Sequence, residues 1–430
     1  MAAAIANGDG APQITVLDNG LRVLCAPMAS ARSASVSLYV GAGSQYERDE
    51  LAGVSHMVEH CVFKGSELHP TAADISTAIE GVGGYINAGT DRELTVYYAK
   101  VPGPDWKTAV DVIVDMVSRP RLKREELEKE RSVILEELAQ VEDSPYQLVA
   151  ELLSEVLWRG TPLGRDIAGT PESVQSIPYD DAVSYWQSQY SPGNALVSVA
   201  GEIDPDLVLA RISELTANWS PADAGVPRDA PLSSDGERVS VRIKDTEQAQ
   251  ISIGVPALTS RHPDRHALGL LTAMLGDGMS SRLFLKVREE LGLVYDVHAS
   301  LALLRDSGVL QVSMGVDPEN VEEALGATLG ELSRMRDGVP EEELDRARRL
   351  AAGRMLMGME DSRAVSAWNG GQALLHDEVK SVDEVNERYQ AVTTEDVARL
   401  ANQYLREDEL RLAVVGPSGE AERFGELLRF

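Results

Sequence analysis

The sequence predicts a mixed α and β protein built from two homologous halves. Strands with alternating apolar residues and amphipathic helices follow one another in the same order in each half. A shift that takes Leu51 to Leu268 lays LAGVSHMVEHCVFKG on LGLLTAMLGDGMSSR, and the same shift lays REELEKERSVILEEL on EEELDRARRLAAGRM. Similarity at one fixed spacing indicates an internal repeat of about 215 residues.

Composition limits the class of protein. The chain has 430 residues, of which 43% are hydrophobic and 25% charged, as in an ordinary soluble globular protein. No apolar run reaches the roughly 20 residues that span a bilayer, so we expect no membrane span. A net charge of −29 argues against nucleic acid as a partner, because phosphate binding needs a basic face. The two cysteines, Cys25 and Cys61, exclude a disulfide scaffold.

Residues 1–12, MAAAIANGDGAP, contain no Lys or Arg. They lack the charged start of a secretory signal and the Arg-rich character of a mitochondrial transit peptide. We therefore expect a disordered stretch at residues 1–12 and a cytoplasmic location.

The first half, residues 13–219, opens with a hairpin over residues 13–26, because alternating residues flank the turn Asp18-Asn19-Gly20. Further strands are predicted at Ala34–Val40, at Tyr85–Val101 as a pair, and at Ala195–Val199. Helices are predicted at residues 51–65, Ala72–Gly81, Trp106–Val117, Lys123–Glu142, Pro145–Trp158, Pro171–Ser176, Asp180–Tyr190 and Pro205–Trp219.

A linker is predicted at residues 220–236, SPADAGVPRDAPLSSDG, which are rich in Pro, Gly, Ser and Asp. The second half, residues 237–430, then repeats the order of elements. Strands are predicted at Val239–Ile243, Ala249–Val255, Leu293–Leu304, Gly308–Val316 and Arg411–Val415. Helices are predicted at His262–Leu275, Ser280–Leu291, Glu319–Arg336, Pro340–Met359 and the C-terminus.

The predicted helix over residues 51–65 carries His56, Glu59 and His60. In a helix the two histidines lie one turn apart with Glu59 between them, and the apolar residues fall on the opposite face. The spacing H-x-x-E-H suits a zinc ion, because zinc takes two neutral imidazoles and the Glu can accept a proton from the attacking water. Short matches of this kind also arise by chance, and paired histidines on a helix surface are common.

The predicted helix over Lys123–Glu142 carries two acids on its semi-buried side. Glu130 and Glu137 lie two turns apart along one face, beside the apolar stripe of Leu127 and Ile134. A carboxylate on such a face needs a partner. In a structural interpretation, the two acids pair with arginines or sit at the edge of the stripe. In a functional one, Glu137 completes a zinc site that Glu130 supports.

The second copy of the repeat lacks this set of residues, which is hard to explain if the set were merely structural in the first copy. In the shifted alignment, His56, Glu59 and His60 face Ala273, Gly276 and Asp277, and Glu130 and Glu137 face Ala347 and Arg354.

The motif His56-x-x-Glu59-His60 with Phe63-Lys64-Gly65, followed by Glu130-Arg131-x5-Glu137, resembles the pitrilysin family of zinc peptidases, which includes the mitochondrial processing peptidases. The resemblance covers nearly the whole chain and is to the short, two-domain, bacterial-type members. It implies an α+β fold of two homologous domains, each a mainly antiparallel β-sheet with helices packed on it.

The resemblance also assigns roles to residues. His56, His60 and Glu137 would bind one Zn²⁺ per chain, Glu59 would be the general base, and Glu130 would be the supporting acid of the distal helix.

Two further segments are similar to substrate-binding parts of the family. Asn87 and Ala88, in GGYINAGT, match an edge strand that binds substrate backbone by β-augmentation. Arg288 and Tyr295, in SSRLFLKVREELGLVY, match residues that stabilise the oxyanion. Without the resemblance, Arg288 is equally a surface helix residue and Tyr295 a strand core residue.

The function implied is a zinc-dependent endopeptidase that cleaves peptides or unfolded protein segments inside a closed chamber. Short members of the family pair two chains, and this chain carries both the zinc set and the Arg288/Tyr295 pair, which favours a homodimer over a heterodimer. The alternatives are a non-catalytic core or scaffold subunit and one half of a heterodimeric processing peptidase. The intact zinc motif argues against a scaffold.

Overall fold

The computed structural model describes residues 3–5, 12–224 and 236–430. Of the predicted linker, residues 225–235 lie outside the described part of the chain. The chain forms two compact units, each with one β-sheet and helices packed on it, so the predicted α+β fold is confirmed. The first unit comprises Met1–Leu138, Asp166–Arg228 and Met355–Val382, and the second comprises Ala139–Arg165, Asp229–Arg354 and Asp383–Phe430.

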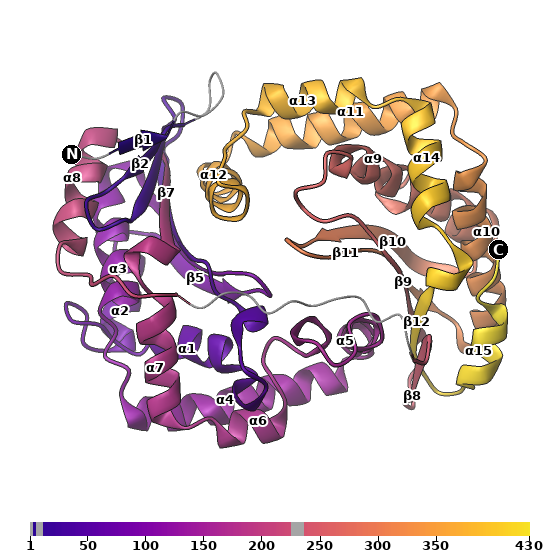
Figure 1. The fold of residues 1–430 in the computed structure, drawn as a ribbon, viewed down its shortest axis with the longest axis horizontal. Helices are drawn as coiled ribbons and strands as arrows, with labels where there is room; N and C mark the ends of the chain where they lie inside the picture. Colours follow the sequence, from indigo (N-terminus) through magenta and orange to yellow (C-terminus); the bar gives the residue numbers. More distant parts are fainter. Residues whose placement is uncertain (1–2, 6–11, 225–235) are drawn as a thin grey trace. The chain divides into compact units, whose positions relative to one another are not determined.

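The sheet of the first unit has seven strands in the order β1-β2-β3-β7-β4-β6-β5. Of these, β1, β2, β5 and β7 are labelled in Figure 1. Neighbouring strands are antiparallel except β3 and β7. The strands are β1 (Ala3–Ile5), β2 (Ile14–Val16), β3 (Arg22–Pro27), β4 (Ser33–Val40), β5 (Tyr85–Thr90), β6 (Thr95–Pro102) and β7 (Ala195–Gly201). Its helices are α1 (Val54–Val62), α2 (Ala72–Glu80), α3 (Trp106–Ser118), most of α4 (Arg124–Asp143), α6 (Pro171–Ser176), α7 (Tyr179–Gln189), α8 (Pro205–Thr216) and α12 (Ser362–His376).

The sheet of the second unit has five strands in the order β10-β11-β9-β12-β8, antiparallel except for β12 and β8. The strands are β8 (Val239–Ile243), β9 (Ala249–Pro256), β10 (Val294–Leu303), β11 (Gly308–Val316) and β12 (Arg411–Gly416). The helices are α5 (Pro145–Leu157), α9 (Arg265–Gly276), α10 (Val321–Arg336), most of α11 (Glu341–Gly358), α13 (Val382–Ala391), α14 (Thr394–Tyr404) and α15 (Ala421–Leu427).

The two sheets repeat one topology, as the internal repeat predicts. The order β3-β7-β4-β6-β5 in the first sheet corresponds to β8-β12-β9-β11-β10 in the second, and the one parallel pair stands at the same place in both. The shift that takes Leu51 to Leu268 also takes Pro145, the start of α5, to Ser362, the start of α12.

Helices α5 and α12 are exchanged between the two halves of the sequence. Helix α12 packs on β4 and β7 of the first sheet, whereas α5 packs on β9 and β12 of the second (Figure 1). The sequence predicted continuous halves at residues 13–219 and 237–430, but the compact units are assembled from non-contiguous stretches.

Strand β4 explains how α12 fits on the first sheet. Its residues Val36 and Leu38 point to the apolar core shared with α3, and Ser35 and Ser37 point to the opposite face, which α12 covers. The Ser362 hydroxyl lies 2.9 Å from Ser35 Oγ. A helix with small residues can therefore approach this serine-lined face closely.

The closest approach is at Gly370 of α12. A Cβ there would lie 2.2 Å from the Tyr39 ring, and Tyr39 is buried. One turn earlier, the Ser366 hydroxyl lies 2.9 Å from both Ser37 Oγ and the Ser198 carbonyl oxygen.

Several predictions of secondary structure need correction. No element was predicted over residues 360–410, where α12, α13 and α14 lie. The sequence does not predict α12 because most of the residues that this helix buries are small or polar, with Leu374 the one large apolar residue among them. In addition, Asn369-Gly370-Gly371 is typical of a turn. The predicted helix Ser280–Leu291 contains a π-helical segment, Phe284–Glu290.

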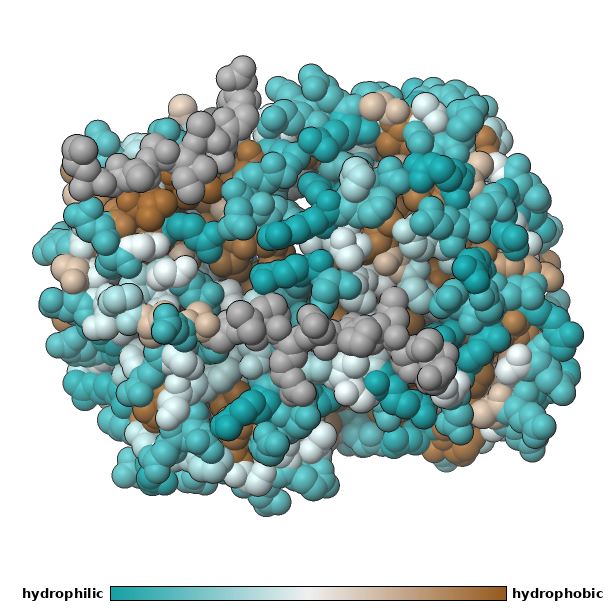
Figure 2. Space-filling view, viewed as in Figure 1, coloured by the Kyte–Doolittle hydropathy of each residue, from teal (hydrophilic) through white to brown (hydrophobic). Residues whose placement is uncertain are grey.

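The N-terminal stretch, expected to be disordered, contains strand β1. Its three residues pair with the edge of β2 that faces away from β3, an edge with no other partner among the described strands. Residues 1–2 and 6–11 lie outside the described part of the chain. In the described part of the chain, no helix is both long enough and apolar enough to cross a bilayer. The face drawn in Figure 2 is mostly hydrophilic, with hydrophobic residues scattered among hydrophilic ones.

The docking of α12 predicts opposite effects for two adjacent glycines. We expect Gly370→Ala to lower the free energy of unfolding by about 1–3 kcal/mol, because the added methyl group overpacks against Tyr39. Gly371→Ala is the matched control, since a Cβ there meets nothing within 4 Å, and a gain of up to about 1 kcal/mol in helix propensity is expected. Urea unfolding of both variants measures the difference, and equal stabilities would contradict this packing.

The N-terminus of α12 predicts a pH effect. Asp361 accepts hydrogen bonds from the Arg363 and Ala364 N–H groups (2.8 and 3.0 Å) and pairs with Lys100 of β6. The hydrogen bond from Lys100 and those from the helix lower the pKa of Asp361. The ionised carboxylate therefore stabilises the fold above its unfolded pKa of about 3.9, and this stabilisation is lost as the pH falls through the lower folded-state pKa.

Asp361→Asn keeps the cap but removes the charge, so we expect it to lower the free energy of unfolding by less than about 1 kcal/mol at neutral pH, as for other exposed ion pairs. The difference from the parent protein should be constant from about pH 7 to 5 and shrink below about pH 4. Urea unfolding across this pH range measures it. A difference that persists undiminished at about pH 2 would contradict the role of the charge.

Candidate metal centre

Helix α1 presents His56, Glu59 and His60 from a firmly seated backbone. Its opposite face is buried, as the helical spacing predicts, through Val54, Met57, Val58 and Cys61. The buried carboxylate of Glu47 holds the N-terminus of the helix, accepting hydrogen bonds from the Gly53 and Ser55 N–H groups at 2.8 Å each.

Gly53 allows this close seating of α1. Its φ of 92° lies in the left-handed region that favours glycine, and a Cβ there would lie 2.3 Å from the Ala168 carbonyl oxygen. The start of α1 is therefore fixed against the loop that contains Ala168.

Helix α4 supplies the two acids on its semi-buried face. Glu130 is buried and Glu137 is partly buried, whereas Glu136 is exposed, in agreement with the predicted helical face. Arg131 fixes the helix by donating hydrogen bonds to the carbonyl groups of Val174 and Ile177.

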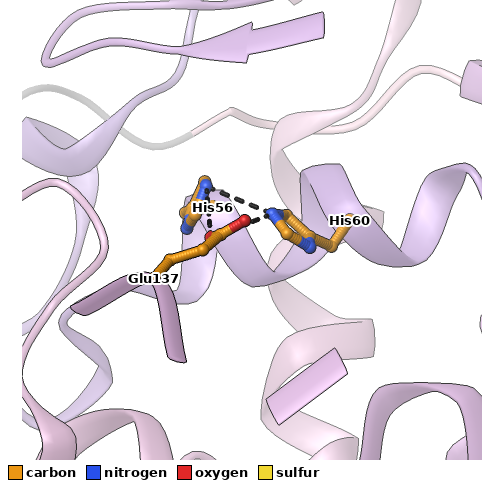
Figure 3. A group of neighbouring side chains, drawn as sticks. All are labelled: His56, His60 and Glu137. Atoms are coloured by element: carbon orange, nitrogen blue, oxygen red, sulfur yellow. Dashed lines mark hydrogen bonds and ion pairs between the residues drawn. The ribbon is translucent and has the colours of Figure 1, made fainter. Parts of the chain in front are cut away.

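The side chains of His56, His60 and Glu137 converge on one point (Figure 3). The two Nε2 atoms lie 3.3 Å apart, and Glu137 Oε2 lies 3.8 Å from His56 Nε2 and 3.6 Å from His60 Nε2. One potential ligand atom from each of the three residues lies within 4.8 Å of the other two. Among the described residues, these three form the group that could hold a metal ion.

This geometry fits a single small cation. Ligands in a tetrahedral zinc site, at about 2.0–2.1 Å from the ion, lie about 3.3 Å from one another, close to the spacings of these three atoms. Burial and the neighbouring His60 lower the pKa of His56 to about 4, so this imidazole is neutral near pH 7 and can donate an electron pair. Two imidazoles and one carboxylate are a donor set typical of catalytic zinc.

Glu130 and Lys64 orient His60. Glu130 Oε2 lies 3.0 Å from His60 Nδ1, and its Oε1 lies 2.7 Å from Lys64 Nζ. A carboxylate that accepts the Nδ1–H leaves Nε2 without a proton and aimed at the other two donors. Lys64 balances the charge of the buried Glu130.

Glu59 lies on the same face of α1 but outside the converging group. Thr90 Oγ1 donates a hydrogen bond of 2.6 Å to Glu59 Oε2. The pKa of Glu59 is raised, mainly because the carboxyl group is buried. The hydrogen bond from Thr90 lowers this pKa but does not outweigh the burial. A raised pKa suits a group that must accept and return a proton.

Asn87 and Ala88 lie on β5, the outermost strand of the first sheet. Among the described strands it pairs with β6 alone, so its other edge offers backbone groups for an added strand. Asn87 is exposed, and its Oδ1 accepts a hydrogen bond from the Ala88 N–H (2.8 Å).

Arg288 and Tyr295 belong to the second unit and lie together there. The Arg288 guanidinium carbon lies 5.3 Å from the centre of the Tyr295 ring and 4.7 Å from that of Phe284. Tyr295 falls at a register shift between β10 and β11, which projects its side chain outward, 76% exposed. It is therefore not a strand core residue, and its action at the candidate metal centre stays a prediction.

The equivalent place in the second copy holds an ion pair. Asp277 and Arg354, the residues that the shift lays on His60 and Glu137, form a salt bridge. Opposite charges on these two side chains satisfy each other directly.

Two residues of the site were not assigned roles from the sequence. Lys64 appeared only as part of the motif, although its position four residues after His60 places it on the same helical side. Thr90 lies in the segment GGYINAGT but received no role of its own, because its partner Glu59 is distant in sequence and only the fold brings them together.

Comparison with known proteins identifies the family. Residues 22–171 match insulinase (peptidase family M16), and residues 176–350 match the peptidase M16 inactive domain. The chain is 34% identical over 421 residues to an uncharacterized zinc protease of Streptomyces coelicolor. The aligned region covers 96% of this chain and 91% of the relative.

Solved structures share the fold. A protease from Helicobacter pylori superposes with a TM-score of 0.87 at 20% identity, covering 97% of this chain and 99% of that chain. A chain of complex III2 from Candida albicans superposes with a TM-score of 0.83 at 20% identity and the same coverage. The resemblance drawn from the sequence is thus confirmed: the chain belongs to the insulinase and pitrilysin family of M16 peptidases.

Proposed function

We propose that this protein is a zinc-dependent endopeptidase that cleaves peptides or unfolded protein segments. The observation that carries the proposal is the convergence of His56 Nε2, His60 Nε2 and Glu137 Oε2, with Glu59 on the same helix face. The name of the Streptomyces coelicolor relative, an uncharacterized zinc protease, supports zinc as the ion. The His56, His60 and Glu137 group supports one ion per chain.

Each side chain of the first unit then has one task. A bound zinc ion would supply a Lewis acid that makes a water molecule acidic near neutral pH and polarises the scissile carbonyl. Glu59 accepts a proton from the attacking water and passes it to the leaving amine. His56, His60 and Glu137 hold the ion, and Glu130 fixes His60 in the tautomer that leaves Nε2 free.

The substrate is bound as an extended strand. Backbone groups at Asn87 and Ala88 on the free edge of β5 pair with the peptide, which requires an unfolded segment. Arg288 and Tyr295 donate hydrogen bonds to the carbonyl oxygen of the scissile bond as it gains negative charge.

The working form in this proposal is a pair of chains that encloses a chamber, with a homodimer as the first expectation and a heterodimer as the second. The partner molecules are peptides or unfolded polypeptides, and the location is cytoplasmic. The net charge of −29 would favour basic substrates by long-range attraction.

Glu59→Gln tests the reaction. The amide cannot accept the proton, so we expect kcat to fall by about 100-fold or more, whereas zinc binding stays at the level of the parent protein. The measurement is hydrolysis of a mixed pool of unstructured peptides, read by mass spectrometry, with and without a chelator and after zinc is added back.

Cleavage that needs the metal and is lost in Glu59→Gln supports the peptidase. Metal-dependent cleavage that persists in Glu59→Gln would contradict the role of this base. If the parent protein neither binds zinc nor cleaves peptides, the proposed function is contradicted and a scaffold subunit is favoured.

Glu130→Gln tests the support of the metal centre. The change keeps the shape but removes the charged acceptor of the His60 Nδ1–H, so we expect zinc affinity to fall by about 10- to 100-fold. Competition with a chromophoric chelator measures the affinity. Glu125→Gln, on the exposed side of the same helix, is the control and should bind zinc like the parent, whereas unchanged affinity in folded Glu130→Gln would refute this support.

A further inference from the structure

Thr90 makes the shortest polar contact found at Glu59. Its Oγ1 lies 2.6 Å from Glu59 Oε2. An ionised carboxylate can only accept, so the Thr90 hydroxyl is the donor in the form of Glu59 that works as a base. The contact joins the end of strand β5 to the middle of α1.

The backbone at Thr90 is held rigidly by its neighbours. Thr90 is the last residue of β5, and the loop that follows it lies against Gly43–Gln45. The Asp91 and Arg92 carbonyl oxygens accept hydrogen bonds from the Ser44 and Gln45 N–H groups (3.1 and 2.9 Å).

Gly43 makes this contact possible. A Cβ on Gly43 would lie 2.0 Å from the Asp91 carbonyl oxygen, so only glycine allows the two segments to approach so closely. The Thr90 hydroxyl is therefore presented from a fixed position, which is what a group that orients another side chain requires.

We propose that Thr90 is a positioning residue for the general base. By engaging Oε2, its hydroxyl stops rotation of the Glu59 carboxylate and leaves Oε1 to accept the proton of the attacking water. Thr90 also ends the edge strand that carries Asn87 and Ala88, so one strand holds both the proposed peptide edge and the hydrogen bond that aims the base. This inference rests on the proposed peptidase function.

The test compares Thr90→Val with Thr90→Ser. Valine keeps the shape of the side chain but cannot donate, so we expect kcat to fall by about 10- to 100-fold, as for other small misplacements of a catalytic group. KM and zinc content should stay within about twofold of the parent, because neither the strand edge nor the ligands change. Thr90→Ser restores the donor, and its kcat should lie within about threefold of the parent.

Thr15→Val is the matched control. Thr15 is a half-buried threonine in strand β2 of the same sheet, far along the strand order from β5, and the change should leave kcat unaltered. A fall in Thr15→Val equal to that in Thr90→Val would show a general effect on the sheet and overturn the inference.

A double variant tests whether Thr90 acts through Glu59. Glu59→Asp shortens the side chain away from the Thr90 hydroxyl, so adding Thr90→Val to it should lower kcat by less than about twofold. Full additivity of the two changes would overturn the inference, as would Thr90→Val with the kcat of the parent. In both cases metal-dependent cleavage by the parent protein would leave the proposed function standing, whereas a parent that cleaves nothing would overturn both.

Discussion

The first unit is organised around three electron-pair donors that are held within 4.8 Å of one another. Two imidazole nitrogens and a carboxylate oxygen at this spacing are best stabilised by a cation between them. The surrounding contacts keep the donors together: Glu47 anchors the start of α1, and Arg131 ties α4 to the C-terminal end of α6 at Val174 and Ile177. Glu130 then fixes the tautomer of His60.

The second copy of the repeat has the same sheet topology but lacks the three converging donors. Its sheet has the same strand order, yet the positions of His60 and Glu137 are taken by Asp277 and Arg354, which neutralise each other. Elsewhere in the second unit, Arg288 lies beside Tyr295 at the register shift between β10 and β11. The two units thus share a strand order but carry different side chains at the aligned positions, and a fold alone does not fix function.

Local pattern was enough to predict part of this molecule. Helical spacing placed His56 and His60 on one face and distinguished Glu137 from Glu136, because both inferences depend only on residues within one helix. The docking of α12 could not be predicted, since its helix buries serine and glycine against a distant serine-lined sheet. The Thr90–Glu59 contact was missed for the same reason: nothing near either residue in sequence points to the other.

X-ray absorption at the zinc edge, on protein loaded with one equivalent of zinc, tests directly whether His56, His60 and Glu137 bind the ion. We expect nitrogen and oxygen ligands at about 2.0–2.1 Å, a scattering pattern that requires two imidazoles, and no sulfur ligand. In His56→Ala we expect the signal of one imidazole to be lost. A spectrum with sulfur from Cys61, or one that is unchanged in His56→Ala, would contradict the proposed metal centre.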